Sequence, residues 1–166
     1  MHNSVLDSKA TVEHPATGIG DRKRLAAGLS GLLADTYVLL IKTQGYHWNV
    51  VGPLFVSIHQ LTETHYKNLF GAADLIAERI RALGYPAPSS MNELIPHTGV
   101  VEDIGNPTAE TMIESLAHDH ETVVQRLRQA TQVAEELHDH VTADMLTARM
   151  AFHEKAIWLL KAITTS

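Results

Sequence analysis

The chain has 166 residues, a formal net charge of -6 with histidine neutral, and no cysteine. This length suits a single domain, and an apolar content of 45% is enough for a core. The lack of cysteine excludes disulfides, zinc–thiolate sites and thiol nucleophiles, so any chemistry must use His, Asp, Glu or Tyr. The acidic balance argues against a surface built mainly to bind phosphate, whereas the 11 histidines raise the question of a metal.

The N-terminal segment, residues 1–20, mixes Ser, Thr, Gly, Pro and His without an apolar period. We therefore expect a mobile tail there, followed by one domain over 21–166. The sequence shows neither the apolar core of a signal peptide nor an apolar stretch of about 18 residues that could span a bilayer. No membrane association and a cytoplasmic location are the default expectations.

Apolar residues recur at helical spacing in four later segments, which predicts four helices. The first covers about 21–50 and ends before Gly52. The second covers about 55–83 and ends at Gly84. The prolines that follow Gly84 exclude its continuation.

A long connection with four prolines follows over 84–107, and Ser90–Leu94 could form a short helix within it. The third helix is expected to have Asn106 as its N-cap and Pro107 as its first residue, and the fourth to be capped by Asp139. No strand alternation is visible. The predicted fold is all-α, a ferritin-like four-helix bundle with one long crossover between the second and third helices.

The second helix carries His59, Glu63, Asp74 and Glu78 on one face, because about 100° per residue brings all four within about 100° of each other. Asp74 and Glu78 are four residues apart and would repel each other unless a cation lay between them. A solvated acidic helix face is the ordinary alternative for such a pair.

His59 and Asp74 are 15 residues apart, hence about 22 Å along one helix, and cannot bind the same ion within one chain. A second copy of this helix, antiparallel across a twofold axis near Lys67 or Asn68, would bring His59 of one chain level with Asp74 and Glu78 of the other. An isologous dimer would then hold two equivalent sites.

His47 lies in the last turn of the first helix, twelve residues before His59 and across the short turn at Gly52. It can approach the same site, although a histidine near a helix C-terminus is often only stabilised by the helix dipole. Mixed imidazole and carboxylate ligands with open positions suit ferrous iron, and zinc would bind them as well. Composition and spacing thus predict a nitrogen/oxygen metal site at a dimer interface.

The ordered motifs resemble the Dps family (DNA-binding protein from starved cells). The resemblance covers about 21–164 and rests on His47-Trp48-Asn49-Val50, Gly52, Phe55, His59, Glu63, Asp74, Ala77-Glu78-Arg79, and the blocks Thr142–Thr147 and His153–Trp158. It implies a cage of twelve identical subunits that oxidises Fe(II), with hydrogen peroxide in preference to oxygen, stores the ferric mineral and so limits oxidative damage.

The resemblance also implies residue roles. Ferroxidase centres would be shared by twofold-related subunits, with His47 and His59 from one chain and Asp74 and Glu78 from the other. Glu63 would be a bridging or second ligand beside His59.

Three further residues have less direct roles. Trp48, which is next to a proposed ligand, would be a one-electron donor or a side chain that fills the hydrophobic core. His153 could supply an imidazole to a second metal position, and Asp144 could line an acidic threefold pore at the start of the last helix. A conventional ferritin site needs two Glu-x-x-His motifs in one bundle, and this chain has only Glu135-x-x-His138, without a partner copy.

Protection of DNA is the alternative function that the family name suggests. The first 24 residues, however, carry only four basic residues against three acidic ones. Multiplied over twelve subunits, the acidic balance of the chain would repel a duplex. DNA binding is therefore possible but not favoured.

Overall fold

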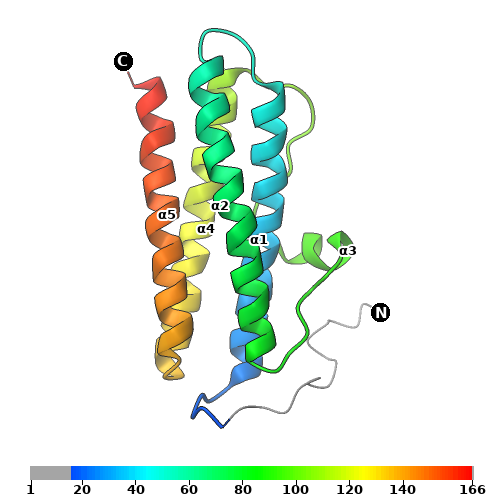
Figure 1. Cartoon of the computed structure of the whole chain (residues 1–166), viewed down its shortest axis with the longest axis vertical. Helices are drawn as coiled ribbons and strands as arrows, with labels where there is room; N and C mark the ends of the chain where they lie inside the picture. Colours follow the sequence, from blue (N-terminus) through cyan, green and yellow to red (C-terminus); the bar gives the residue numbers. More distant parts are fainter. Residues whose placement is uncertain (1–15, 166) are drawn as a thin grey trace.

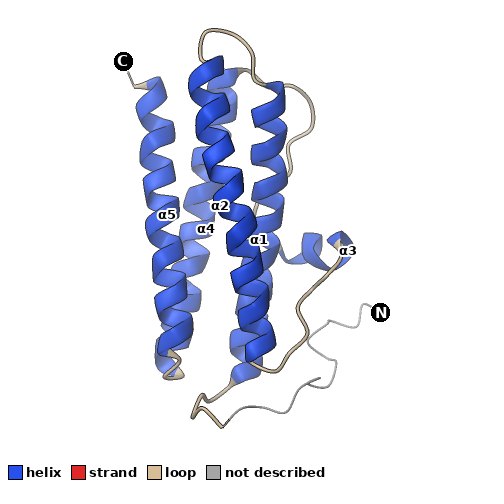
Figure 2. Cartoon of the chain, in the orientation of Figure 1, coloured by secondary structure: helices blue, strands red, loops and turns tan. Residues whose placement is uncertain are grey.

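The computed structural model describes residues 16–165, which form four long helices and a short helical segment (Figure 1). The elements are α1 (Arg22–Asn49), α2 (Phe55–Ala82), α3 (Met91–Leu94), the 3-10 turn η2 (Ile95–His97), α4 (Ala109–Glu136) and α5 (His140–Thr164). Within this described part there is no strand (Figure 2). The predicted all-α four-helix bundle is confirmed.

The helices form two antiparallel pairs, α1 with α2 and α4 with α5 (Figure 1). α2 and α4 run in the same direction, so the chain between them must return along the whole bundle. The predicted crossover is therefore present, and its short helix α3 begins after Ser90. Ser90 and Glu93 form a capping box, in which each side chain accepts from the other residue's backbone amide.

Local signals explain where the helices end. The Asp21 and Asp139 side chains accept from backbone amides in the first turns of α1 and α5, each at 3.0 Å, as predicted for Asp139. Gly52 and Gly84 follow α1 and α2 with φ values of 93° and 94°, a backbone region that favours glycine. The predicted bounds 21–50 and 55–83 are thus correct to about one residue.

The predicted start of the third helix was wrong by two residues. Thr108, not Asn106, is the N-cap of α4, and its hydroxyl accepts from the Thr111 amide at 3.3 Å. Pro107 precedes the cap instead of opening the helix. The threonine hydroxyl satisfies a first-turn amide as asparagine would have done, so the chain begins the helix at the later of two suitable caps.

A buried ion pair fixes the crossover to the bundle. Arg126 Nη1 on α4 donates to Asp35 Oδ1 on α1 at 2.6 Å, and Nη2 donates to the His97 carbonyl at 2.9 Å. The Gly99 amide also donates to Asp35 Oδ1 at 2.7 Å. Burial raises the pKa of Asp35, while the hydrogen bond from Gly99 and the charge of Arg126 oppose that rise.

Helix α1 is the most buried of the four. By length and composition it could cross a membrane, but 72% of its apolar 18-residue window is buried in the bundle, as in the core helix of a globular protein. The expectation that the sequence has no apolar stretch of about 18 residues was therefore wrong for this helix. Its position explains this composition, because a helix surrounded by other elements is apolar on several sides.

The predicted tail at residues 1–20 lies largely outside the described residues. Residues 16–20 have no regular structure, although Ile19 packs against the core and a Cβ added to Gly20 would lie 3.2 Å from the Leu137 side chain. The folded domain therefore includes at least these two positions before α1.

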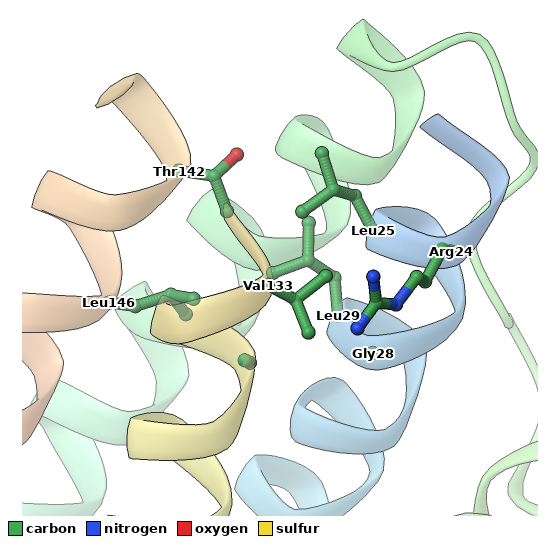
Figure 3. A pocket seen from close by; sticks show the side chains of 8 residues that line it. Arg24, Leu25, Gly28, Leu29, Val133, Thr142 and Leu146 are labelled. Atoms are coloured by element: carbon green, nitrogen blue, oxygen red, sulfur yellow. The ribbon is translucent and has the colours of Figure 1, made fainter. Parts of the chain in front are cut away.

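Substituting Gly28 by alanine should stabilise the fold. Gly28 lies within α1 beside a cavity of about 40 Å³ that Leu25, Leu29 and Val133 help to line (Figure 3), and an added Cβ would meet nothing within 4 Å. We expect a gain of about 0.5–1 kcal/mol, because alanine loses less backbone entropy on folding. Thermal unfolding should show a rise of a few degrees.

Gly99→Ala is the matched control, since its Cβ would lie 2.8 Å from Arg126 Nη1 and should lower the melting temperature. Equal melting temperatures for the two alanine variants would contradict this reading of the packing.

Candidate metal centre

Two histidines from successive helices stack on each other at one end of the α1–α2 hairpin. The rings of His47 and His59 have centroids 3.8 Å apart and an interplanar angle of 16°. His47 is in the last turn of α1 and His59 is in the second turn of α2, and the tight turn at Gly52 brings them together. This juxtaposition confirms that His47 approaches His59, as their spacing suggested.

Hydrogen bonds to the backbone fix the tautomer of both rings. His47 Nδ1 donates to the His59 carbonyl and His59 Nδ1 donates to the His47 carbonyl, each at 2.8 Å. A carbonyl oxygen can only accept, so both Nδ1 atoms carry the proton. In the neutral form of each ring the lone pair then lies on Nε2, which is the atom left to bind a metal.

Neighbouring side chains restrict the ring orientations. The Tyr66 ring meets His47 edge-on with centroids 5.2 Å apart, and Phe55 stacks on the other face of the pair, 5.0 Å from His59. The Thr62 hydroxyl is buried and donates to carbonyls of α2 below the rings. The pair is thus positioned without any metal.

Glu63 lies one turn after His59 and pairs with Lys67. Lys67 Nζ is 2.5 Å from Glu63 Oε1 on the exposed surface of α2. The hydrogen bond and charge of Lys67 lower the pKa of Glu63, and the charges of His47 and His59 lower it further. The carboxylate is therefore close enough to sense the histidine pair, as expected of a further ligand.

Asp74 and Glu78 lie further along α2 and do not join this group within one chain. Both are exposed, and neither forms an ion pair in the described part of the chain. Among residues 16–165, no group of three or more His, Asp or Glu could hold a metal. One subunit thus presents two separated halves, with imidazoles at one end of α2 and carboxylates near the other.

Large apolar side chains are exposed on the same helix. Val56, Phe70 and Leu75 expose 60%, 68% and 56% of their surface. Val56 and Phe70 fall at about 60° and 20° from His59 around the helix axis, on the face of the site residues. An apolar surface of this kind indicates a face that another protein surface covers.

The structure gives little support for a contact between Trp48 and the site. Trp48 is 67% exposed, and no ring contact joins it to His47 or His59 in residues 16–165. Trp48 is therefore not a core side chain of the single subunit. Its role as electron donor stays a prediction.

His153 lies in a buried cluster with His65 and His120, not beside His47. The three histidines come from α2, α4 and α5 and are at most 2% exposed. The Nδ1 atoms of His120 and His153 are 2.7 Å apart, in hydrogen-bond contact. The sequence analysis missed His65 and His120, which occupy inward positions of otherwise apolar helix faces. The available signal was a histidine at a position where the apolar period predicts an apolar residue.

The remaining candidates lie near the α4–α5 turn. Asp144 is exposed about one turn inside α5, so a pore role stays a prediction. Glu135 and His138 are both exposed, and His138 ends α4 with a φ of 58°. Their motif therefore points away from the bundle interior, where a conventional di-iron site would have to lie.

Comparisons with known proteins agree with the observed fold. The ferritin-like domain family matches residues 26–166. A low-temperature-induced protein of Nostoc is 43% identical over 78% of this chain and 74% of its own length, and a DNA protection during starvation protein of Brevibacillus brevis is 34% identical over 83% and 93%. The fold also superposes on the crystal structure of a Dps protein from Vibrio cholerae, with a TM-score of 0.84 and 25% identity, over 91% of this chain and 99% of that one. That protein is described as a member of a broad superfamily of ferritin-like diiron-carboxylate proteins.

Proposed function

Because this chain belongs to the Dps family of ferritin-like proteins, we propose that it oxidises ferrous iron at sites shared between two subunits and stores the ferric product. The observation that carries the proposal is the stacked pair His47 and His59, in which both Nδ1 atoms are bonded to backbone carbonyls, so that Nε2 is the metal-binding atom of each neutral ring. A pair of imidazoles oriented in this way is half of a metal site.

The second half comes from a second copy of the chain. Antiparallel pairing of two α2 helices around Lys67 and Asn68 would place Asp74 and Glu78 of one copy opposite His59 of the other, since the helix rises about 1.5 Å per residue. The same pairing would cover Val56 and Phe70, which are exposed on one subunit. One arrangement thus completes the ligand set and buries the apolar face.

The donor set suits iron as substrate. Carboxylates favour the ferric product, imidazoles accept the ferrous ion, and Glu63 could bridge to a second ion. Zinc has similar preferences and would compete for the same ligands. Two ferrous ions supply the two electrons that reduce one hydrogen peroxide to water. The preference for peroxide over oxygen rests on the resemblance to the family.

A closed shell of twelve subunits would provide the storage volume. Its threefold openings would be lined by the start of α5, where three copies of Asp144 would concentrate Fe(II) by their charge. Trp48 would then be an electron donor near the site. DNA binding remains the second candidate function, and the name of the Brevibacillus relative is what favours it.

Replacing His59 by alanine should reduce the initial rate of ferrous oxidation at least roughly tenfold, because the site loses a ligand and His47 loses its stacking partner. The rate is followed by ferric absorbance after adding Fe(II) and peroxide. His97→Ala is the control, since that side chain is exposed in η2 and the hydrogen bond from Arg126 is accepted by its backbone carbonyl. Equal rates for the two variants would rule out His59 as a ligand.

A further inference from the structure

The Lys67 ammonium lies where a second cation would have to bind. Its Nζ is 2.5 Å from Glu63 Oε1, and the two side chains are 64% and 42% exposed. The Lys67 ammonium thus contacts the Glu63 carboxylate, which the proposed site needs for its second ion. An ordinary i,i+4 pair on a helix surface contributes little to stability, so its position matters more than its energy.

Pairing of two subunits would strengthen this contact. Lys67 is close to the residue level at which antiparallel α2 helices would cross, so two Lys67 side chains would approach the twofold axis together. Each ammonium would be balanced by its own Glu63. Removing water from this surface raises the strength of every charge interaction on it, including the competition between the ammonium and a metal cation for Glu63.

We propose that Lys67 is a built-in competitor for the second metal position, so that a second divalent cation binds beside Glu63 only by displacing the lysine ammonium. This inference rests on the proposed function and deepens it. The first cation, held by imidazoles and by the carboxylates of the other copy, does not face this competition. Because Lys67 contacts Glu63 from the same helix, the two metal positions of one site therefore differ in their affinity for a cation.

The unequal positions have a consequence for the reaction. A site with one ferrous ion can supply one electron, whereas peroxide needs two for complete reduction. Displacement of Lys67 makes the second ion depend on a high local concentration of Fe(II). After the second ion leaves, the ammonium can return to Glu63 and neutralise it.

The test is a Zn²⁺ titration of the assembled protein by calorimetry, which needs no turnover. The wild type should bind one Zn²⁺ per site tightly and a second weakly. Lys67→Met should tighten the second binding step by roughly tenfold or more and leave the first unchanged. Lys67→Arg, which keeps the charge, should behave as the wild type.

Lys161→Met is the matched surface control. Lys161 Nζ on α5 lies 2.5 Å from Glu121 Oε1 on α4, with exposures of 59% and 41%, so it forms a lysine–glutamate pair of the same length and similar exposure that uses none of the proposed ligands. It should leave both steps unchanged. Size-exclusion chromatography verifies that each variant assembles.

An unchanged or weakened second step in an assembled Lys67→Met variant would overturn the inference, while the first step would still support the metal site. If even the wild type binds no Zn²⁺, or if His59→Ala does not weaken the first step, the proposed function fails and this inference with it.

Discussion

Subunits carrying His59→Ala mixed with subunits carrying Asp74→Ala should oxidise ferrous iron, although neither variant should do so alone. The two residues are about 22 Å apart along α2, so each active site must draw them from different chains. In a mixed dimer, one site combines both substitutions and the other combines neither. Random mixing should therefore restore about one quarter of all sites.

The measurement is the initial rate of iron oxidation by co-assembled protein, compared with each variant alone. A mixture of His47→Ala and His59→Ala is the matched control. These two residues belong to the same half of the site, so no combination of the two chains gives an intact site. No recovery in the first mixture despite assembly would show that the site lies within one chain. Recovery in the control would show that His47 and His59 belong to different halves of the site.

The folded protein should lose stability steeply as the pH falls from about 6.5 toward 4. Burial lowers the pKa of His65 from 6.5 to about 4 and that of His120 to about 3. Burial also lowers the pKa of His153 strongly, and the charge of Arg149 disfavours protonation of both His120 and His153. The folded state thus holds all three histidines neutral in a range where the unfolded chain protonates them.

The sign follows from proton linkage. The unfolded chain binds more protons below pH 6.5, so the free energy of unfolding is highest above that pH and declines as the pH falls toward the folded-state values. Three protons give a slope of about 4 kcal/mol per pH unit in the middle of this range. For His65 alone, the shift of its pKa to about 4 corresponds to a loss on the order of 3 kcal/mol.

Two buried carboxylates oppose part of this loss. Burial raises the pKa values of Asp35 and Asp119, so the folded state binds protons more readily there. The three histidines outnumber these two carboxylates, so the free energy of unfolding should still decline as the pH falls below 6.5.

His65→Leu separates this cluster from other histidines. Its Nδ1 is buried without a hydrogen-bond partner, so leucine should raise the melting temperature at neutral pH and remove about one third of the pH slope. Denaturant unfolding at several pH values measures both. His97→Leu, at an exposed position, should leave the slope unchanged. The same slope in both variants would mean that acid acts elsewhere.

Much of the fold could be predicted because its signals are local. Apolar spacing located all four long helices, and glycine and aspartate marked several of their ends. The start of α4 was misplaced because Asn106 and Thr108 are both good caps and nothing nearby in the sequence chooses between them. The Asp35–Arg126 pair could not be foreseen, since its partners are 91 residues apart.

The residues of the candidate site could be proposed from the sequence, but the orientation of its rings could not. The 15-residue separation of His59 and Asp74 predicted that two chains are needed, and spacing placed His47 near His59. The orientation of the two rings depends on backbone carbonyls, which carry no signal in the sequence. The buried partners of His153 likewise became visible only when three helices were packed together.

The mutual hydrogen bonds of His47 and His59 have a consequence for how subunits meet. They join residues only twelve apart, so the imidazole half forms as soon as the α1–α2 hairpin folds. The side chains of His47 and His59 have then lost their conformational entropy before two subunits associate. At the proposed two-chain site the imidazole half would therefore meet its partner already ordered, and neither the incoming subunit nor the metal would spend binding energy on orienting these two ligands.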